Sequence, residues 1–170
     1  MSLLIPIGLK KDRPGQYLVD GVADGFEAFA LASAAAETAP DGPVVFVARD
    51  GQRLPAIVEA LAFAAPDLPV LELPAWDCLP YDRVSPGSDA AARRLDAMAA
   101  MIGLRQSPHR AVVLTTANAL LQRMPPAAAI EAQTLKARAG NVIDMKVLVA
   151  RLENAGFERV ATVRDVGEYA

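Results

Sequence analysis

The sequence predicts an α/β protein of three layers, in which a mostly parallel sheet carries helices on both of its faces. Two patterns lead to this prediction. Short apolar runs, rich in β-branched residues, alternate along the chain with longer segments in which apolar residues recur at helical spacing. The clearest short run, PVVFVA at 43–48, is apolar throughout, which is typical of a strand buried on both faces of a parallel sheet.

The elements of this first domain follow one another between residues 16 and 123. Asp50 and Asp89 are expected to cap the second and third helices, and Pro55 fits only the first turn of the second. Strands are expected at 16–19, 43–48, 70–73 and 111–115, and helices at 26–36, between 50 and 66, at 89–102 and at 116–123. The residues expected to face the core from the second and third helices are Leu54, Ile57, Val58, Leu61, Leu95, Met98, Ala99, Met101 and Ile102.

The pattern of residues changes after Pro125-Pro126, and we place a domain boundary near residue 130. Residues 1–130 then form the first domain, and residues 131–170 form a small α+β fragment of a second one. In this fragment we expect a weak strand at 133–136, a helix that Asp144 caps and Gly156 ends, and strands at 159–163 and 166–170. The residues of that helix expected to face inward are Met145, Leu148, Leu152 and Ala155.

Composition narrows the classes of function. Hydrophobic residues make up 53% of the chain and charged residues 22%, so that 170 residues can bury a core. The net charge of −3 does not favour a dedicated nucleic-acid binder, because phosphate contacts need clustered Lys and Arg. Cys78 and His109 are the only residues of their types, which excludes an internal disulfide and leaves a histidine metal site or catalytic triad poorly supplied. No apolar run reaches the length of a membrane span, and we expect a cytoplasmic protein.

The turn after the expected first strand lies where a nucleotide-binding α/β domain cradles phosphate. That chemistry uses the spacing G-x-x-x-x-G-K-[ST], with glycines for close backbone approach, Lys for the β- and γ-phosphates and Ser or Thr for Mg²⁺. Gly21 keeps the first glycine, and Gly25 lies one position before the second. Phe26, Glu27 and Ala28 replace the last three positions. The stretch therefore predicts a degenerate phosphate loop, with an ordinary strand-to-helix turn as the alternative.

The charges at this turn also predict that it does not bind a nucleotide. Asp24 and Glu27 place two carboxylates where a triphosphate would carry its own negative charge. At ~4 Å and an effective dielectric constant near 20, one such like-charge pair opposes binding by roughly 4 kcal/mol. We therefore expect no bound cofactor and no ATP at this turn.

Two long strings of residues carry a family resemblance. Residues 74–95 read PAWDCLPYDRVSPGSDAAARRL, and residues 112–126 read VVLTTANALLQRMPP. Both resemble the N-terminal region of bacterial transcription-repair coupling factors (Mfd), which is similar to the damage-recognition subunit UvrB. The tail resembles the end of the same region, with its G-E-[FY]-A run. The residues at the positions of the family's motifs are Trp76, Leu79, Pro80, Tyr81, Asp82, Arg94, Gln122, Arg123, Gly167 and Glu168.

The resemblance implies a first domain of P-loop NTPase type, UvrB-like, whose phosphate loop is degraded and which a second domain interrupts. In the family, the inserted domain docks the ATPase UvrA and packs against the C-terminal part of the full protein. The residues that contact UvrA lie beyond Ala170 in the family pattern. The resemblance thus implies an adaptor without catalytic, cofactor or metal residues of its own, and with RNA polymerase and DNA as partners of the full-length translocase only.

Alternatives remain open for the function and for single residues. The chain could be a competent nucleotide-binding enzyme of doubly wound type, or a helicase accessory domain that grips DNA non-specifically. Trp76 and Leu79 could pin a loop instead of binding a partner. Solvated surface is the simpler account of three further groups: the carboxylates Asp77, Asp82 and Asp89; a basic face of Arg83, Arg93, Arg94, Arg105, His109 and Arg110; and a basic rim of Lys136, Arg138, Lys146 and Arg151.

Overall fold

A three-stranded parallel sheet organises the larger part of the molecule. The computed structural model describes residues 7–8, 15–38, 42–78, 81, 83–135 and 139–170. The strands are β1 (Val44–Ala48), β2 (Val70–Leu73) and β3 (Val112–Thr116), in the order β1-β3-β2. Val112 of the central strand lies in register with Val44 on one side and Val70 on the other. All five residues of β3 are buried, as expected for a central parallel strand.

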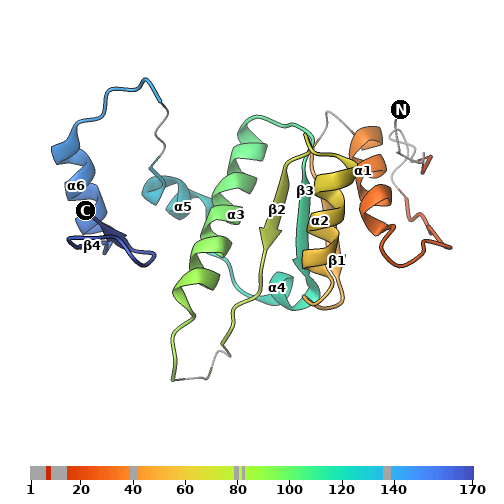
Figure 1. Cartoon of the computed structure of the whole chain (residues 1–170), viewed down its shortest axis with the longest axis horizontal. Helices are drawn as coiled ribbons and strands as arrows, with labels where there is room; N and C mark the ends of the chain where they lie inside the picture. The colour runs from red at the N-terminus through yellow and green to blue at the C-terminus, as the bar shows by residue number, and fades with distance from the viewer. Residues whose placement is uncertain (1–6, 9–14, 39–41, 79–80, 82, 136–138) are drawn as a thin grey trace.

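Helices cover both faces of this sheet, which confirms the three-layer α/β prediction. In Figure 1, α1 (Glu27–Thr38) and α2 (Leu54–Ala64) lie on one side and α3 (Ser88–Gln106) lies on the other. Alanines of α1 and large apolar residues of α2 pack on Val112 and Leu114, because the small side chains let α1 lie close to the sheet. On the other face, Leu73 packs with Ala97 and Met98 of α3. α4 (Ala117–Leu121) and α5 (Ala127–Gln133) follow β3.

Two of the predicted strands, those expected at 16–19 and from Gln133 onward, are not found at the described residues of these segments. Residues 16–19 have no strand conformation and are exposed. A short strand is stable only beside a hydrogen-bonding neighbour, and neither sheet formed by the described residues includes this segment. Gln133 ends α5 instead of starting a strand, since its backbone continues the helix that contains the buried Ile130; Lys136 lies outside the described residues.

Two expected helix caps are also wrong. α2 begins at Leu54, and Asp50 accepts a hydrogen bond from the Gln52 backbone in the preceding turn. α3 begins at Ser88, so Asp89 lies inside its first turn, where it forms an ion pair with Arg93. Pro55 lies in the first turn of α2, as predicted.

The inward face of α3 differs from the predicted one. Ala90, Arg94, Ala97 and Met98 are its buried residues next to the sheet, together with Leu104 near its end. Leu95, which was expected to face the core, is 48% exposed. Met98 is buried, and Ala99, Met101 and Ile102 pack partly buried against the same core, as predicted. The face therefore departs from the prediction at Leu95 and in containing an arginine.

The C-terminal residues form a small unit with little interior. It consists of α6 (Met145–Asn154), β4 (Glu158–Arg159) and β5 (Glu168–Tyr169), with the two strands parallel. Asp144 caps α6 by accepting hydrogen bonds from the backbone of Lys146 and Val147, and Gly156 ends the helix with a φ of 86°, both as predicted. No residue of α6 is buried, and Met145, expected to face inward, is 64% exposed.

The domain boundary near residue 130 stays a prediction. Ile130 of α5 packs with Leu73 and Met98 of the sheet domain, and Gln106 of α3 donates a hydrogen bond to Glu131. Within the described part of the chain, no helix is both long enough and apolar enough to cross a bilayer.

Candidate functional site

Three motif residues of the two resemblance strings, Trp76, Arg94 and Gln122, meet around one buried arginine side chain. Arg94 of α3 is 0% exposed. Its guanidinium donates hydrogen bonds to the carbonyl oxygens of Pro74, just after β2, and of Ala119, in α4 at 3.2 Å. The guanidinium carbon lies 5.0 Å from the centre of the Trp76 ring, within the range of a cation–π contact. The side-chain oxygen of Gln122 accepts a hydrogen bond of 2.8 Å from the backbone N–H of Trp76.

We call Trp76, Arg94, Ala119 and Gln122 the Arg94 cluster. It ties together three segments at the carboxyl ends of β2 and β3, the edge at which α4 and the loop after β2 lie (Figure 1). Carbonyl oxygens and a ring face surround the guanidinium, and burial lowers the pKa of Arg94. Arginine nevertheless stays charged in proteins, and its Nε has no hydrogen-bond partner among the described residues. Buried carbonyl dipoles and the Trp76 ring therefore hold a full charge.

Arg94 consequently does not belong to an exposed basic face. The sequence contained a signal for this, because Arg94 lies four residues after Ala90 and four before Met98, in register with the buried stripe. The other residues of that proposed face that have been described are exposed on the surface, namely Arg83, Arg93, Arg105, His109 and Arg110.

The loop between β2 and α3 closes at a second contact. The Asp77 carboxylate accepts hydrogen bonds of 3.1 and 3.2 Å from the backbone N–H of Gly87. A Cβ on Gly87 would lie 2.6 Å from an Asp77 oxygen, so that any side chain at this position would displace the Asp77 carboxylate. Tyr81 is 96% exposed beyond this closure, whereas the predicted motif residues Leu79, Pro80 and Asp82 lie outside the described residues.

The predicted phosphate loop has its helix start where the spacing places it. α1 begins at Glu27, and Gly21 and Gly25 have φ values of 69° and 88°, a region that favours glycine. Ala28, at the position of the metal-binding Ser or Thr, is 1% exposed and packs in the core. Phe26 is 52% exposed, and its ring centre lies 5.4 Å from that of Phe29.

The charges of this loop form a cluster that the sequence did not indicate. Arg53, in the turn before α2, lies 2.7 Å from a carboxylate oxygen of Asp24 and 2.7 Å from one of Glu27. The other Glu27 oxygen accepts a hydrogen bond of 2.8 Å from the backbone N–H of Gly25. We call Asp24, Glu27 and Arg53 the Arg53 cluster. The hydrogen bond to Asp24, with both carboxylates close by, raises the pKa of Arg53.

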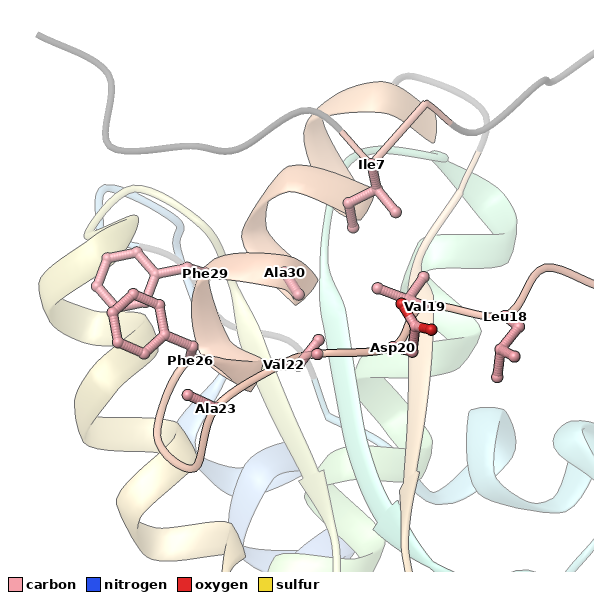
Figure 2. Close-up of a pocket in the computed structure, with 10 residues that line it drawn as sticks. Ile7, Leu18, Val19, Asp20, Val22, Ala23, Phe26, Phe29 and Ala30 are labelled. Atoms are coloured by element: carbon pink, nitrogen blue, oxygen red, sulfur yellow. The ribbon is translucent and has the colours of Figure 1, made fainter.

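A hollow lies beside this loop, and its described lining residues include no cation. It has a volume of about 570 Å³, and its walls are the 18–23 segment, the first turns of α1 and Ile7 (Figure 2). Asp20 is the one charged residue among the described residues that line it. The other side chains that Figure 2 labels are apolar, including Leu18, Val22, Phe26 and Phe29. Among the described residues of this lining, an anion would meet a carboxylate and neither Lys nor Arg.

The remaining predicted motif residues organise the C-terminal unit. The Glu168 carboxylate accepts hydrogen bonds from the backbone N–H groups of Arg164, at 2.7 Å, and Asp165, at 3.1 Å. These bonds lower the pKa of Glu168. Gly167 has a φ of 97°, which permits the turn into β5. The Tyr169 hydroxyl donates to Glu153 of α6 at 3.0 Å, and partial burial with this carboxylate nearby raises the pKa of Tyr169.

The described acidic residues do not assemble a metal centre. No group of three or more His, Cys, Asp or Glu side chains comes together within the described part of the chain. The Asp77 carboxylate accepts a hydrogen bond from the Gly87 N–H, and Asp89 forms an ion pair with Arg93. Asp82 lies outside the described residues. Arg123 is exposed next to the half-buried Gln122, and Lys146 and Arg151 are exposed on α6, while Lys136 and Arg138 are not described.

Comparison with known proteins identifies relatives of one kind. No protein-family model matches the chain. The transcription-repair-coupling factor of Escherichia coli K12 is 31% identical over 129 residues, which are 76% of this chain and 11% of that protein. The proteins of the same name from Myxococcus xanthus and Mycobacterium tuberculosis are 32% and 31% identical over 75% and 80% of this chain. The chain spans about a tenth of the length of these relatives.

Proposed function

The chain belongs to the transcription-repair-coupling factors, as a homologue of their N-terminal region, and we propose that it is a non-catalytic adaptor in transcription-coupled DNA repair. In this proposal it helps to recruit UvrA to a stalled RNA polymerase in the cytoplasm. Translocation on DNA, ATP hydrolysis and contact with RNA polymerase are assigned to other parts of the full-length protein.

One observation carries the non-catalytic part of the proposal. A catalytic phosphate loop needs free backbone N–H groups at the helix start, a Lys and a hydroxyl. Here the Glu27 carboxylate accepts the Gly25 N–H and pairs with Arg53. Ala28, which replaces the hydroxyl residue, is buried in the core and has no group that binds a metal.

The adaptor part rests on the C-terminal unit and on the family. Residues 141–170 place apolar side chains such as Val142, Met145 and Val147 at the surface, and none of α6 is buried. An exposed apolar surface of this kind marks a contact with another part of a protein or with a partner. We propose that further residues complete this unit and that the completed unit docks UvrA, with the C-terminal part of the full protein as a competing contact.

The test compares two lengths of chain. Binding of UvrA is measured by calorimetry to the 170-residue chain and to a chain that continues into the second domain. The proposal expects weak or undetectable binding of the short chain and saturable binding of the longer one. Absence of binding by the longer chain would contradict the adaptor role.

A parallel titration with ATP tests the non-catalytic part separately. No saturable binding is expected at millimolar concentrations of ATP and Mg²⁺. Saturable binding at micromolar ATP would support the competing hypothesis of a competent nucleotide-binding domain. A titration with duplex DNA at several salt concentrations tests the DNA-gripping hypothesis, which requires an affinity that falls steeply with salt.

A further inference from the structure

The Arg53 cluster changes the way in which this loop excludes phosphate. Two carboxylates alone would repel an anion, but Arg53 lies 2.7 Å from each of them and neutralises part of their charge. The three side chains sum to a charge of −1 instead of −2. The repulsion of a phosphate by this loop is therefore weaker than the sequence suggests. A second cause is needed to explain why the loop would not bind phosphate.

We infer that Glu27 acts as a built-in anion, an intramolecular contact that occupies the groups a phosphate would use. One carboxylate oxygen takes the Gly25 backbone N–H, and the other takes the Arg53 guanidinium. These are the two kinds of donor that bind phosphate at a helix start, a backbone amide and a fork-shaped cation. Occupancy by Glu27, more than repulsion, keeps the loop closed.

The same contact fastens the loop to the next layer of the fold. Arg53 precedes α2, whereas Asp24 and Glu27 belong to the loop and to the start of α1. Glu27 has a side chain only 21% exposed, which limits the competition from water, whereas Asp24 is 96% exposed. Glu27 is thus the principal anchor, and Asp24 fixes the outer side of the guanidinium.

This inference is independent of whether the chain recruits UvrA. It concerns only the loop and can be tested without any partner. Its failure would leave the UvrA-binding part of the proposed function standing, because that part rests on the C-terminal unit. Failure of UvrA binding would likewise leave the contact between Glu27 and Arg53 untouched.

Two substitutions at one position separate occupancy from repulsion. Glu27→Gln removes the charge but keeps an oxygen that can accept the Gly25 N–H. Glu27→Ala removes both the charge and the oxygen. Amide hydrogen exchange of Gly25 is measured by NMR, and the chain is titrated with inorganic phosphate as a probe of vacated donors. Glu59→Ala, which removes an exposed carboxylate from α2, is the control for the change in net charge.

Occupancy predicts different behaviour for the two variants. Exchange at Gly25 should accelerate about tenfold in Glu27→Ala, in line with the loss of one hydrogen bond, and much less in Glu27→Gln. Phosphate should shift the Gly25 and Arg53 resonances only in Glu27→Ala, and Glu59→Ala should behave as the native chain. An equal response of the two Glu27 variants, no response of either, or a phosphate-induced shift in the native chain overturns the inference.

Discussion

Two arginines hold loops at the same edge of the sheet in opposite surroundings. Arg94 is buried, and carbonyl oxygens and the Trp76 ring surround it. Arg53 is exposed and is bound by two carboxylates. A buried charge is costly unless its hydrogen bonds are made, so the Arg94 cluster depends on each of its partners. An exposed ion pair contributes little and is screened by salt.

This difference in surroundings indicates that the Arg94 cluster is a structural centre of the domain, whereas the Arg53 cluster is a local contact. The Arg94 cluster joins β2, α3 and α4, so that its loss affects the whole sheet domain. The Arg53 cluster joins one loop to one turn. Three of the motif residues, Trp76, Arg94 and Gln122, thus lie at the structural centre, where they hold the carboxyl edge of the sheet in place.

The largest effect is expected for Arg94→Ala. It leaves the buried carbonyl oxygens of Pro74 and Ala119 without donors and opens a cavity next to Trp76, at a cost of about 3 kcal/mol or more of unfolding free energy. Urea denaturation followed by circular dichroism measures the change. Arg53→Ala, the matched deletion at the exposed cluster, should shift the midpoint far less. Equal shifts would contradict the distinction between the two arginines.

A smaller effect is expected for Trp76, which is half-buried beside Arg94. Trp76→Ala removes the ring face and much of its packing, and should lower the unfolding free energy by about 2 kcal/mol. Trp76→Phe keeps an aromatic face and should lose about 1 kcal/mol or less. In an Arg94→Ala background both changes should matter less, because the cation is gone. Full additivity in that double-mutant cycle would show that the ring does not stabilise the guanidinium.

A still smaller, local effect is expected at the hydrogen bonds between Asp77 and Gly87, which close the loop after β2. In Gly87→Ala, the new Cβ displaces the Asp77 carboxylate, which is exposed and can move, so the loss should stay below about 1 kcal/mol. The amide of residue 87 should exchange faster with solvent. Asp77→Ala should have the same effect, and the double variant should show no further loss. An additive double variant would indicate that the two residues act separately.

The sequence predicted secondary structure best where a single local pattern determines it. VVFVA and VVLTT form strands near the predicted positions, because β-branched runs favour extended backbone. Only VVLTT is buried throughout; VVFVA is an edge strand with Val45 and Val47 exposed, so the prediction that it is buried on both faces was wrong. The sequence was least informative where a distant partner decides. Residues 16–19 have strand-like composition but belong to neither sheet of the described residues, and Arg53 lies 26 positions from the Glu27 it binds. No local periodicity carries information of that kind.

For the candidate site, identity of residues was predictable and their surroundings were not. Trp76, Arg94 and Gln122 could be selected as motif residues, but an arginine in a helix is usually exposed. Only its register with Ala90 and Met98 suggested burial. The absence of Lys at position 27 was plain in the sequence, whereas the cation supplied from the turn before α2 appears only in three dimensions.

The smallest effect, and the one with a defined pH dependence, concerns Glu168 in the C-terminal unit. Two backbone hydrogen bonds lower its pKa in the folded unit, so the unfolded chain binds the proton more readily. The stabilisation is therefore complete above the ordinary glutamate pKa and is lost as the pH falls through the lower folded value. Protection of the Arg164 and Asp165 amides, measured as exchange relative to the intrinsic rate at each pH, should be high near neutral pH and should fall as the solution is acidified.

Glu168→Gln tests this mechanism directly. An amide oxygen can still accept the two N–H groups but does not titrate in this range, so exchange at Arg164 and Asp165 should be faster at neutral pH and should lose its acid transition. Glu158→Gln, on the neighbouring strand β4, keeps the Glu168 contacts and should retain the transition. If the transition moved with Glu158 instead, the turn before β5 would depend on strand pairing more than on the Glu168 carboxylate. The C-terminal unit would then resemble the Arg94 cluster, held by its packing, more than the Arg53 cluster, held by exposed charge.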